Sequence, residues 1–128
     1  MFDWNDYFAL AKKLKRQTIL VEACLRSSIS RAYYAAYNIA FKYSLSGNLR
    51  PVFGPTGSGE DHKYLSDYYK SIGRTRGNDD LLEVGNLLRG LYRRREKCDY
   101  NDTIKGNITD LTRRSILDAQ KIINITTV

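Results

Sequence analysis

The positions of the prolines limit most strongly what this chain can fold into. Only two prolines occur among 128 residues, Pro51 and Pro55, and they lie four residues apart. Proline lacks a backbone donor and breaks helices, so the long proline-free stretches on either side favour helical structure. The segment 46–59, SGNLRPVFGPTGSG, also contains four glycines, and we expect a long loop there.

Two long segments, 18–45 and 79–99, carry core-type residues at alternating spacings of three and four. Such spacing places one stripe of residues on one side of a helix. In the first segment the stripe is rich in Ala and Ser, which predicts the close approach of a neighbouring helix. Its members are Val21, Leu25, Ser28, Ala32, Ala35 or Ala36, and Ile39. In the second segment the members are Leu81, Val84, Leu88, Leu91, Arg95 and Cys98.

Three shorter helices are predicted over 3–16, 60–72 and 108–124. Asn78 and Asn107 are suitable N-cap residues for the helices that follow them, and Gly73 is a suitable stop for the 60–72 helix. No alternating strand pattern persists. We therefore predict an all-α fold in a single domain, 1–128, that forms an up-and-down bundle of four main helices plus one short helix.

The charge and composition narrow the functional classes. A net charge of +7 favours a polyanionic partner such as RNA, DNA or an acidic protein. No apolar run is long enough to span a membrane, and the N-terminal residues lack a signal-peptide layout, so a cytoplasmic protein without a membrane partner is expected. Cys24 and Cys98 share no metal spacing with His62, which predicts free thiols and no metal site.

The stretch LYRRREKCDY, residues 91–100, places a charge on an apolar stripe. Arg95 falls on the stripe, whereas Arg93 and Arg94 fall to its sides and are interpreted as solvated. A guanidinium that faces the core must find carboxylates, carbonyls or a ligand. Asp99 lies four residues later on the same face, and Tyr100 follows it. An internal Arg95–Asp99 ion pair and an anion-binding groove are both compatible with this pattern.

The helix at 18–45 has a comparable feature in RSSISRAYYAAY. Arg31 borders the small-residue stripe, and Tyr34 lies one turn after it. Arg31 and Arg95 are therefore predicted to converge on one groove. His62 stands alone in a polar context, where a surface position is the simpler interpretation. No P-loop, zinc or nucleophile-elbow motif is present, and no cofactor is expected.

Three stretches resemble small prokaryotic HEPN-domain proteins. RSSISRAYYAAYNIA resembles the family's Arg-Ser-x-x-Ser-Arg-Ala-Tyr-Tyr-Ala signature, and DHKYL is similar to the histidine-containing start of its third segment. LLRGLYRRREKCDY resembles its Leu-Tyr-x-x-Arg-x-x-x-Asp-Tyr ending. The matches follow the family's order over roughly residues 5–125. The resemblance implies an α-helical bundle, commonly dimeric, that acts either as a metal-independent endoribonuclease or as a binding partner.

The resemblance also implies roles for individual residues. Arg95 matches the motif arginine, but Tyr100 stands where the motif histidine is expected. His62 matches the histidine of the third segment and is the candidate replacement base. Candidate catalytic residues are therefore Arg95, Tyr100 and His62. Candidate RNA- or nucleotide-binding residues are Arg31, Arg95, Asp99 and Tyr34.

Three functional hypotheses remain open from the sequence. The first is a module that binds RNA or a nucleotide phosphate in a basic groove between helices, in a defence or toxin–antitoxin context. It is favoured because tyrosine is a poor base at neutral pH. The second is an active endoribonuclease. The third is a non-catalytic homodimer that is structural or docks a protein partner, such as a nucleotidyltransferase-type protein or an antitoxin.

Overall fold

The computed structural model describes residues 1–46 and 60–127, and the regular secondary structure within them is entirely helical, with no strand. The all-α prediction is confirmed. The predicted loop at 46–59 lies outside the described residues, apart from Ser46. The helices are α1 (Asn5–Lys15), α2 (Val21–Ser44), α3 (Glu60–Arg76), α4 (Asp79–Tyr100) and α5 (Ile108–Thr126).

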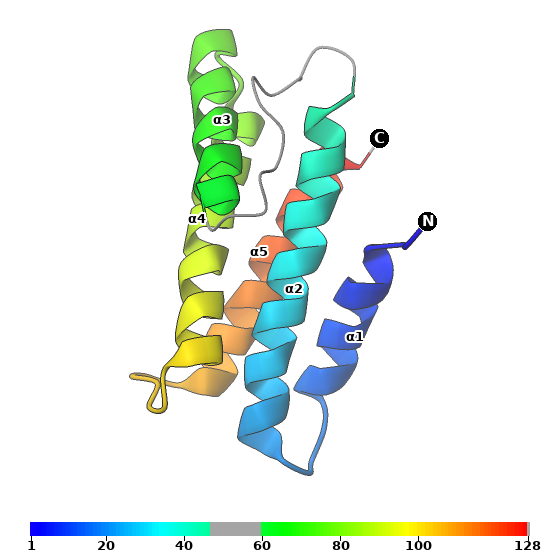
Figure 1. Ribbon diagram of the computed structural model, residues 1–128, viewed down its shortest axis with the longest axis vertical. Helices are drawn as coiled ribbons and strands as arrows, with labels where there is room; N and C mark the ends of the chain where they lie inside the picture. The colour runs from blue at the N-terminus through cyan, green and yellow to red at the C-terminus, as the bar shows by residue number, and fades with distance from the viewer. Residues whose placement is uncertain (47–59, 128) are drawn as a thin grey trace.

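Helix α2 is the centre of the bundle. It packs against α1, α4 and α5, while α3 packs mainly against α4 (Figure 1). The small residues of α2 permit this crowding as predicted: Ser28 is fully buried, and its hydroxyl donates to the Ala11 carbonyl of α1 at 2.7 Å. Val21 is an exception to the predicted stripe, because it is the first residue of α2 and 48% exposed.

The stripe predicted along α4 is buried at all six positions, including Arg95. The predicted N-caps are also confirmed. The Asn78 side chain accepts from the Leu81 amide at 3.1 Å, and the Asn107 side chain accepts from the Asp110 amide at 3.2 Å. These caps satisfy amides that the first turn of each helix leaves without partners.

Gly73 does not end α3, contrary to the sequence prediction. The helix continues to Arg76 and ends at Gly77, which adopts a left-handed φ of 62°. The Asn78 amide then donates to the Gly73 carbonyl at 2.8 Å, and the Gly77 amide donates to the Arg74 carbonyl at 3.3 Å, as in a Schellman cap. Gly73 instead faces α4, where a Cβ would lie 2.4 Å from the Leu82 nitrogen.

Both cysteines are free thiols, as predicted; Cys98 is buried and Cys24 is half-buried. None of the described helices combines the length and the apolar character that a bilayer crossing requires.

Candidate functional site

Arg95 lies inside the bundle with only 6% of its surface exposed. Four tyrosine rings surround its guanidinium, and we call them the tyrosine cage. Their ring centres lie 5.1 to 5.9 Å from the guanidinium carbon; the members are Tyr92, Tyr34, Tyr100 and Tyr33, in order of increasing distance. Aromatic rings at this range attract a cation through their negative faces. The cage therefore holds a buried positive charge mainly by ring contacts.

The hydrogen bonds of Arg95 are few for a buried guanidinium. Its Nη1 donates to Asp99 Oδ2 at a long 3.4 Å, and the Asp99 side chain is 31% exposed. Its Nε is buried and has no hydrogen-bond partner within the described part of the chain. Burial opposes the charge, but Tyr34, Asp99 and Tyr100 raise the pKa of Arg95 overall, so it stays a cation. A guanidinium offers five N–H donors, and the contacts given for Arg95 within residues 1–46 and 60–127 use only part of them.

His62 reaches the same cluster from α3. Its ring stacks on Tyr92 with centres 4.9 Å apart and planes inclined by 23°, and its Nδ1 is hydrogen-bonded to the Tyr33 hydroxyl. Burial, followed by the charge of Arg95, lowers the pKa of His62 below its ordinary 6.5, so the imidazole is neutral at pH 7. The half-buried His62 is therefore a member of the Arg95 cluster and not an isolated surface residue.

Arg31 is not a member of the Arg95 cluster but contacts α1. Its guanidinium carbon is 5.1 Å from the ring centre of Tyr7 in α1, which places the side chain on the α1 side of α2. Tyr34, on the same helix, faces α4 and belongs to the cage. The predicted convergence of Arg31 and Arg95 is thus not what the described contacts show. His62 of α3 takes the place expected of the second arginine.

The three consecutive arginines of α4 have three different environments. Arg93 is exposed, as predicted. The prediction that Arg94 is solvated is wrong, because this residue is half-buried and ion-paired with Asp118 of α5 at 2.7 Å. It also donates a hydrogen bond to Ser115 at 3.1 Å. The helical turn of about 100° per residue explains the difference, since it directs successive side chains to solvent, to α5 and to the cage.

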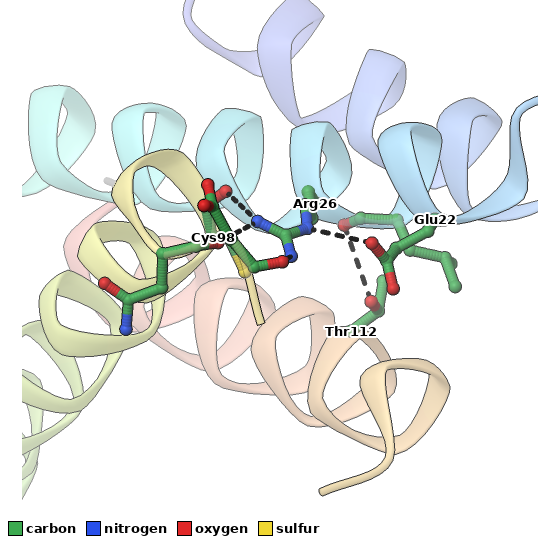
Figure 2. Close-up of polar contacts among 7 residues, drawn as sticks. Glu22, Arg26, Cys98 and Thr112 are labelled. Carbon is green, nitrogen blue, oxygen red and sulfur yellow. Dashed lines mark hydrogen bonds and ion pairs between the residues drawn. The ribbon is translucent and has the colours of Figure 1, made fainter. Parts of the chain in front are cut away.

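Sequence reasoning missed Arg26, which ties α2 to the end of α4 (Figure 2). Its Nη1 donates to the carbonyls of Cys98 at 3.1 Å and Asn101 at 2.5 Å, and its Nη2 donates to the Asp102 carbonyl at 2.9 Å. Glu22 lies 3.4 Å from its Nε. The last carbonyls of a helix lack intrahelical partners, and Arg26 supplies donors to them.

Arg26 therefore fixes the turn that carries Asp99 and Tyr100. The only sequence signal was its place as the first arginine of RSSISR. Nothing in that pattern says which distant carbonyls it would contact.

The environment of His62 predicts that the folded protein loses stability as the pH falls below 6.5. Above pH 6.5 the imidazole is neutral in both the folded and unfolded chain, so it contributes no pH dependence. As pH falls below 6.5, the unfolded chain takes up the proton first, and stability is lost until the lower folded pKa is passed. His62→Gln should reduce this loss, as measured by urea unfolding at about pH 7.5 and about pH 5. The sequence has no other histidine. Equal losses in both proteins would contradict the prediction.

Comparisons with protein-family models, with curated proteins and with solved structures found no match to this chain. The fold and the site define it as a helical bundle with a buried arginine in an aromatic cage. Among the described residues no group of three or more His, Cys, Asp or Glu side chains is placed to hold a metal ion. The cage itself presents a fixed cation, tyrosine hydroxyls and one neutral imidazole.

Proposed function

We propose that this chain is a HEPN-like module that binds the phosphate of RNA or of a nucleotide at Arg95. The observation that carries the proposal is a buried guanidinium whose one carboxylate contact is long and whose Nε has no partner among the described residues. Guanidinium groups bind phosphate through paired N–H donors, and such bonds are stronger in a sheltered site. The net charge of +7 supports a polyanionic ligand.

The approach to Arg95 passes the end of α4. Asp99 and Tyr100 are both exposed there, and Tyr100 is 74% exposed. A phosphate that arrives on this side meets Nη1 where Asp99 now contacts it. Asp99 therefore competes with an anionic ligand for Arg95. Removal of the Asp99 charge should then strengthen ligand binding instead of weakening it.

Asp99→Asn should strengthen binding of a mononucleotide such as AMP by about fivefold, because it removes a negative charge beside the phosphate. Arg95→Gln should weaken the same binding by roughly tenfold or more. Arg16→Gln, which removes an exposed positive charge on the α1–α2 connection, is the matched control. Calorimetric titration at a fixed, low salt concentration measures all three.

A structural role for the cage predicts a different outcome. In that case Asp99→Asn and Arg95→Gln would shift the melting temperature and leave nucleotide binding absent or unchanged. The Asp99 variant keeps the test valid even if Arg95→Gln does not fold. Tighter binding by Asp99→Asn is a result that lost stability does not produce.

A second candidate function is metal-independent RNA cleavage, and the position of His62 favours it. RNA cleavage of this kind needs a base for the 2′-hydroxyl and a cation for the phosphate. His62 and Arg95 both contact the Tyr92 ring, so the neutral imidazole could act as the base and the guanidinium as the cation. Incubation with RNA in EDTA separates the candidates: cleavage lost in His62→Gln supports the nuclease, and RNA that stays bound and intact supports the binding module.

The wider context is proposed on the HEPN resemblance alone. It comprises a prokaryotic defence or toxin–antitoxin system, a homodimer, and a nucleotidyltransferase-type or antitoxin protein partner. Sedimentation analysis tests the homodimer directly, since a monomer at high protein concentration would contradict it.

A further inference from the structure

Three consecutive aliphatic side chains are exposed where α1 turns into α2, at one end of the bundle (Figure 1). Ile19 and Leu20 are 76% and 75% exposed, and Val21, the first residue of α2, is 48% exposed. We call these three residues the aliphatic tip. Single exposed aliphatic residues are common on protein surfaces, but a contiguous apolar group is a candidate interaction site.

The backbone of the aliphatic tip is anchored although its side chains are not packed. The Cys24 amide donates to the Leu20 carbonyl at 2.9 Å, and the Cys24 thiol donates to the Ile19 carbonyl at 3.5 Å. On the α1 side, the Gln17 side chain donates to the Lys13 carbonyl at 3.1 Å. The connection therefore presents its aliphatic side chains to solvent in a defined conformation.

Leu20 also has a backbone conformation that leucine disfavours. Its φ of 51° and ψ of 48° are left-handed, and among the described residues it is the only non-glycine residue with a positive φ. Glycine or asparagine adopts this conformation more easily. Burial of the leucine side chain does not offset the strain, because the side chain is exposed. Strained residues gather at functional sites, and packing does not account for a leucine here.

Cations adjoin the aliphatic tip on the α1 side. The end of α1 and the residue after it carry four of them: Lys12, Lys13, Lys15 and Arg16. Lys13 and Arg16 are exposed, three positions apart, and neither makes an ion pair within residues 1–46 and 60–127. The first acid after the tip, Glu22, lies 3.4 Å from the Arg26 guanidinium, which offsets its charge. An apolar tip thus stands beside a positive rim.

We propose that the aliphatic tip binds an anionic lipid surface. Ile19 and Leu20 enter the boundary between headgroups and acyl chains, and the nearby cations contact the lipid phosphates. Exposed aliphatic groups favour this boundary, and cations are attracted to a leaflet that contains anionic lipids.

Charge argues against a second copy of the chain as the partner of the tip. A symmetric contact would bring two positive rims together, and like charges repel. The sequence expectation of no membrane partner rested on the lack of a spanning segment, and binding at the lipid surface needs none. The inference is independent of the function proposed for Arg95.

Vesicle sedimentation tests the charge contribution. Vesicles of phosphatidylcholine alone are compared with vesicles that contain about 30% phosphatidylserine, at fixed low salt. The wild type should bind the anionic vesicles at least about tenfold more tightly, and added salt should weaken this binding. Lys13→Gln with Arg16→Gln should weaken it roughly tenfold. Arg93→Gln with Lys97→Gln, which removes two exposed charges from α4, is the matched control and should have a much smaller effect.

Leu20→Asn tests the apolar contribution. Asparagine tolerates the left-handed conformation, so this variant should melt at the same temperature as the wild type or higher. Its binding to anionic vesicles should nevertheless fall roughly fivefold, because an inserted aliphatic side chain is lost. Leu117→Gln, which removes a 57% exposed leucine from α5, is the matched control and should bind like the wild type.

Four results would overturn the proposal. The first is no binding to anionic vesicles, and the second is equal weakening by the α4 pair, which would show attraction by net charge alone. The third is a lower melting temperature of Leu20→Asn with unchanged vesicle binding, which would assign Leu20 to the fold. The fourth is self-association that Leu20→Asn abolishes in the absence of vesicle binding, which would assign the tip to a second copy.

Discussion

Gly73→Ala is expected to lower the free energy of unfolding by about 1–2 kcal/mol, because it forces apart two helices that are in backbone contact. A Cβ on Gly73 would lie 2.4 Å from the Leu82 nitrogen and 2.7 Å from its Cα. These are backbone atoms of α4, so no side-chain rotation relieves the overlap. Alanine favours helix over glycine by up to about 1 kcal/mol, but overpacking costs about 1–3 kcal/mol and outweighs it.

Gly85→Ala, on the α4 side of the same contact, should also lower the free energy of unfolding. Its Cβ would lie 2.6 Å from the Ser66 carbonyl oxygen of α3. Gly90, on the same helix, is the matched control, since its nearest neighbour is the end of the Arg94 side chain at 3.4 Å. Gly90→Ala should be neutral or stabilising by up to about 1 kcal/mol. Urea unfolding compares the three variants, and equal stability of Gly73→Ala and Gly90→Ala would contradict the close packing of α3 on α4.

Arg26→Gln is the second large effect that we expect, a loss of roughly 2–3 kcal/mol in the free energy of unfolding. Its guanidinium donates to three carbonyls around the end of α4, and its side chain is only 17% exposed. Hydrogen bonds from a charged donor contribute about 1.5–3 kcal/mol each when removal leaves the acceptors without partners. Two of these hydrogen bonds are exposed, so water can replace the lost donor there. The expected loss is therefore smaller than the summed free energies of the three hydrogen bonds.

Arg26→Lys distinguishes geometry from charge. Lysine keeps the positive charge but cannot direct paired donors at three carbonyls from one planar group. It should therefore recover less than half of the loss in Arg26→Gln. Hydrogen exchange of the α4 end should also accelerate in both variants, with little change in the middle of α2. A lysine variant as stable as the wild type, with unchanged exchange, would show that Arg26 acts only through charge.

The helices of the bundle were predictable because the sequence patterns that specify them are local. All six positions that the three-and-four spacing predicted on α4 are buried, although the buried Gly85 was not among them. The N-caps at Asn78 and Asn107 follow from the side-chain chemistry of one residue. Gly73 shows the limit of such signals. Glycine serves both as a helix stop and as a contact point between helices, and the choice between the two depended on Leu82, a residue of another helix.

The site was predictable in part for the same reason. Arg95 was identified from its place on an apolar stripe, and Asp99 and Tyr34 indeed contact it. His62 was not placed, because the distance between α3 and α4 is set by the packing at Gly73 and Gly85. The Arg26 contacts join residues more than seventy positions apart, and no local pattern encodes them.

The most direct measurement of the central claim is the NMR signal of the Arg95 side chain. Its Nε–H group has no partner among the described residues, so a bound phosphate should shift this signal strongly. The signal is assigned by its absence in Arg95→Gln, and UMP is titrated into uniformly ¹⁵N-labelled protein. We predict a saturable shift at Arg95 that occurs at lower UMP concentration in Asp99→Asn. An Arg95 signal that stays fixed while UMP shifts other arginines would contradict phosphate binding in the tyrosine cage.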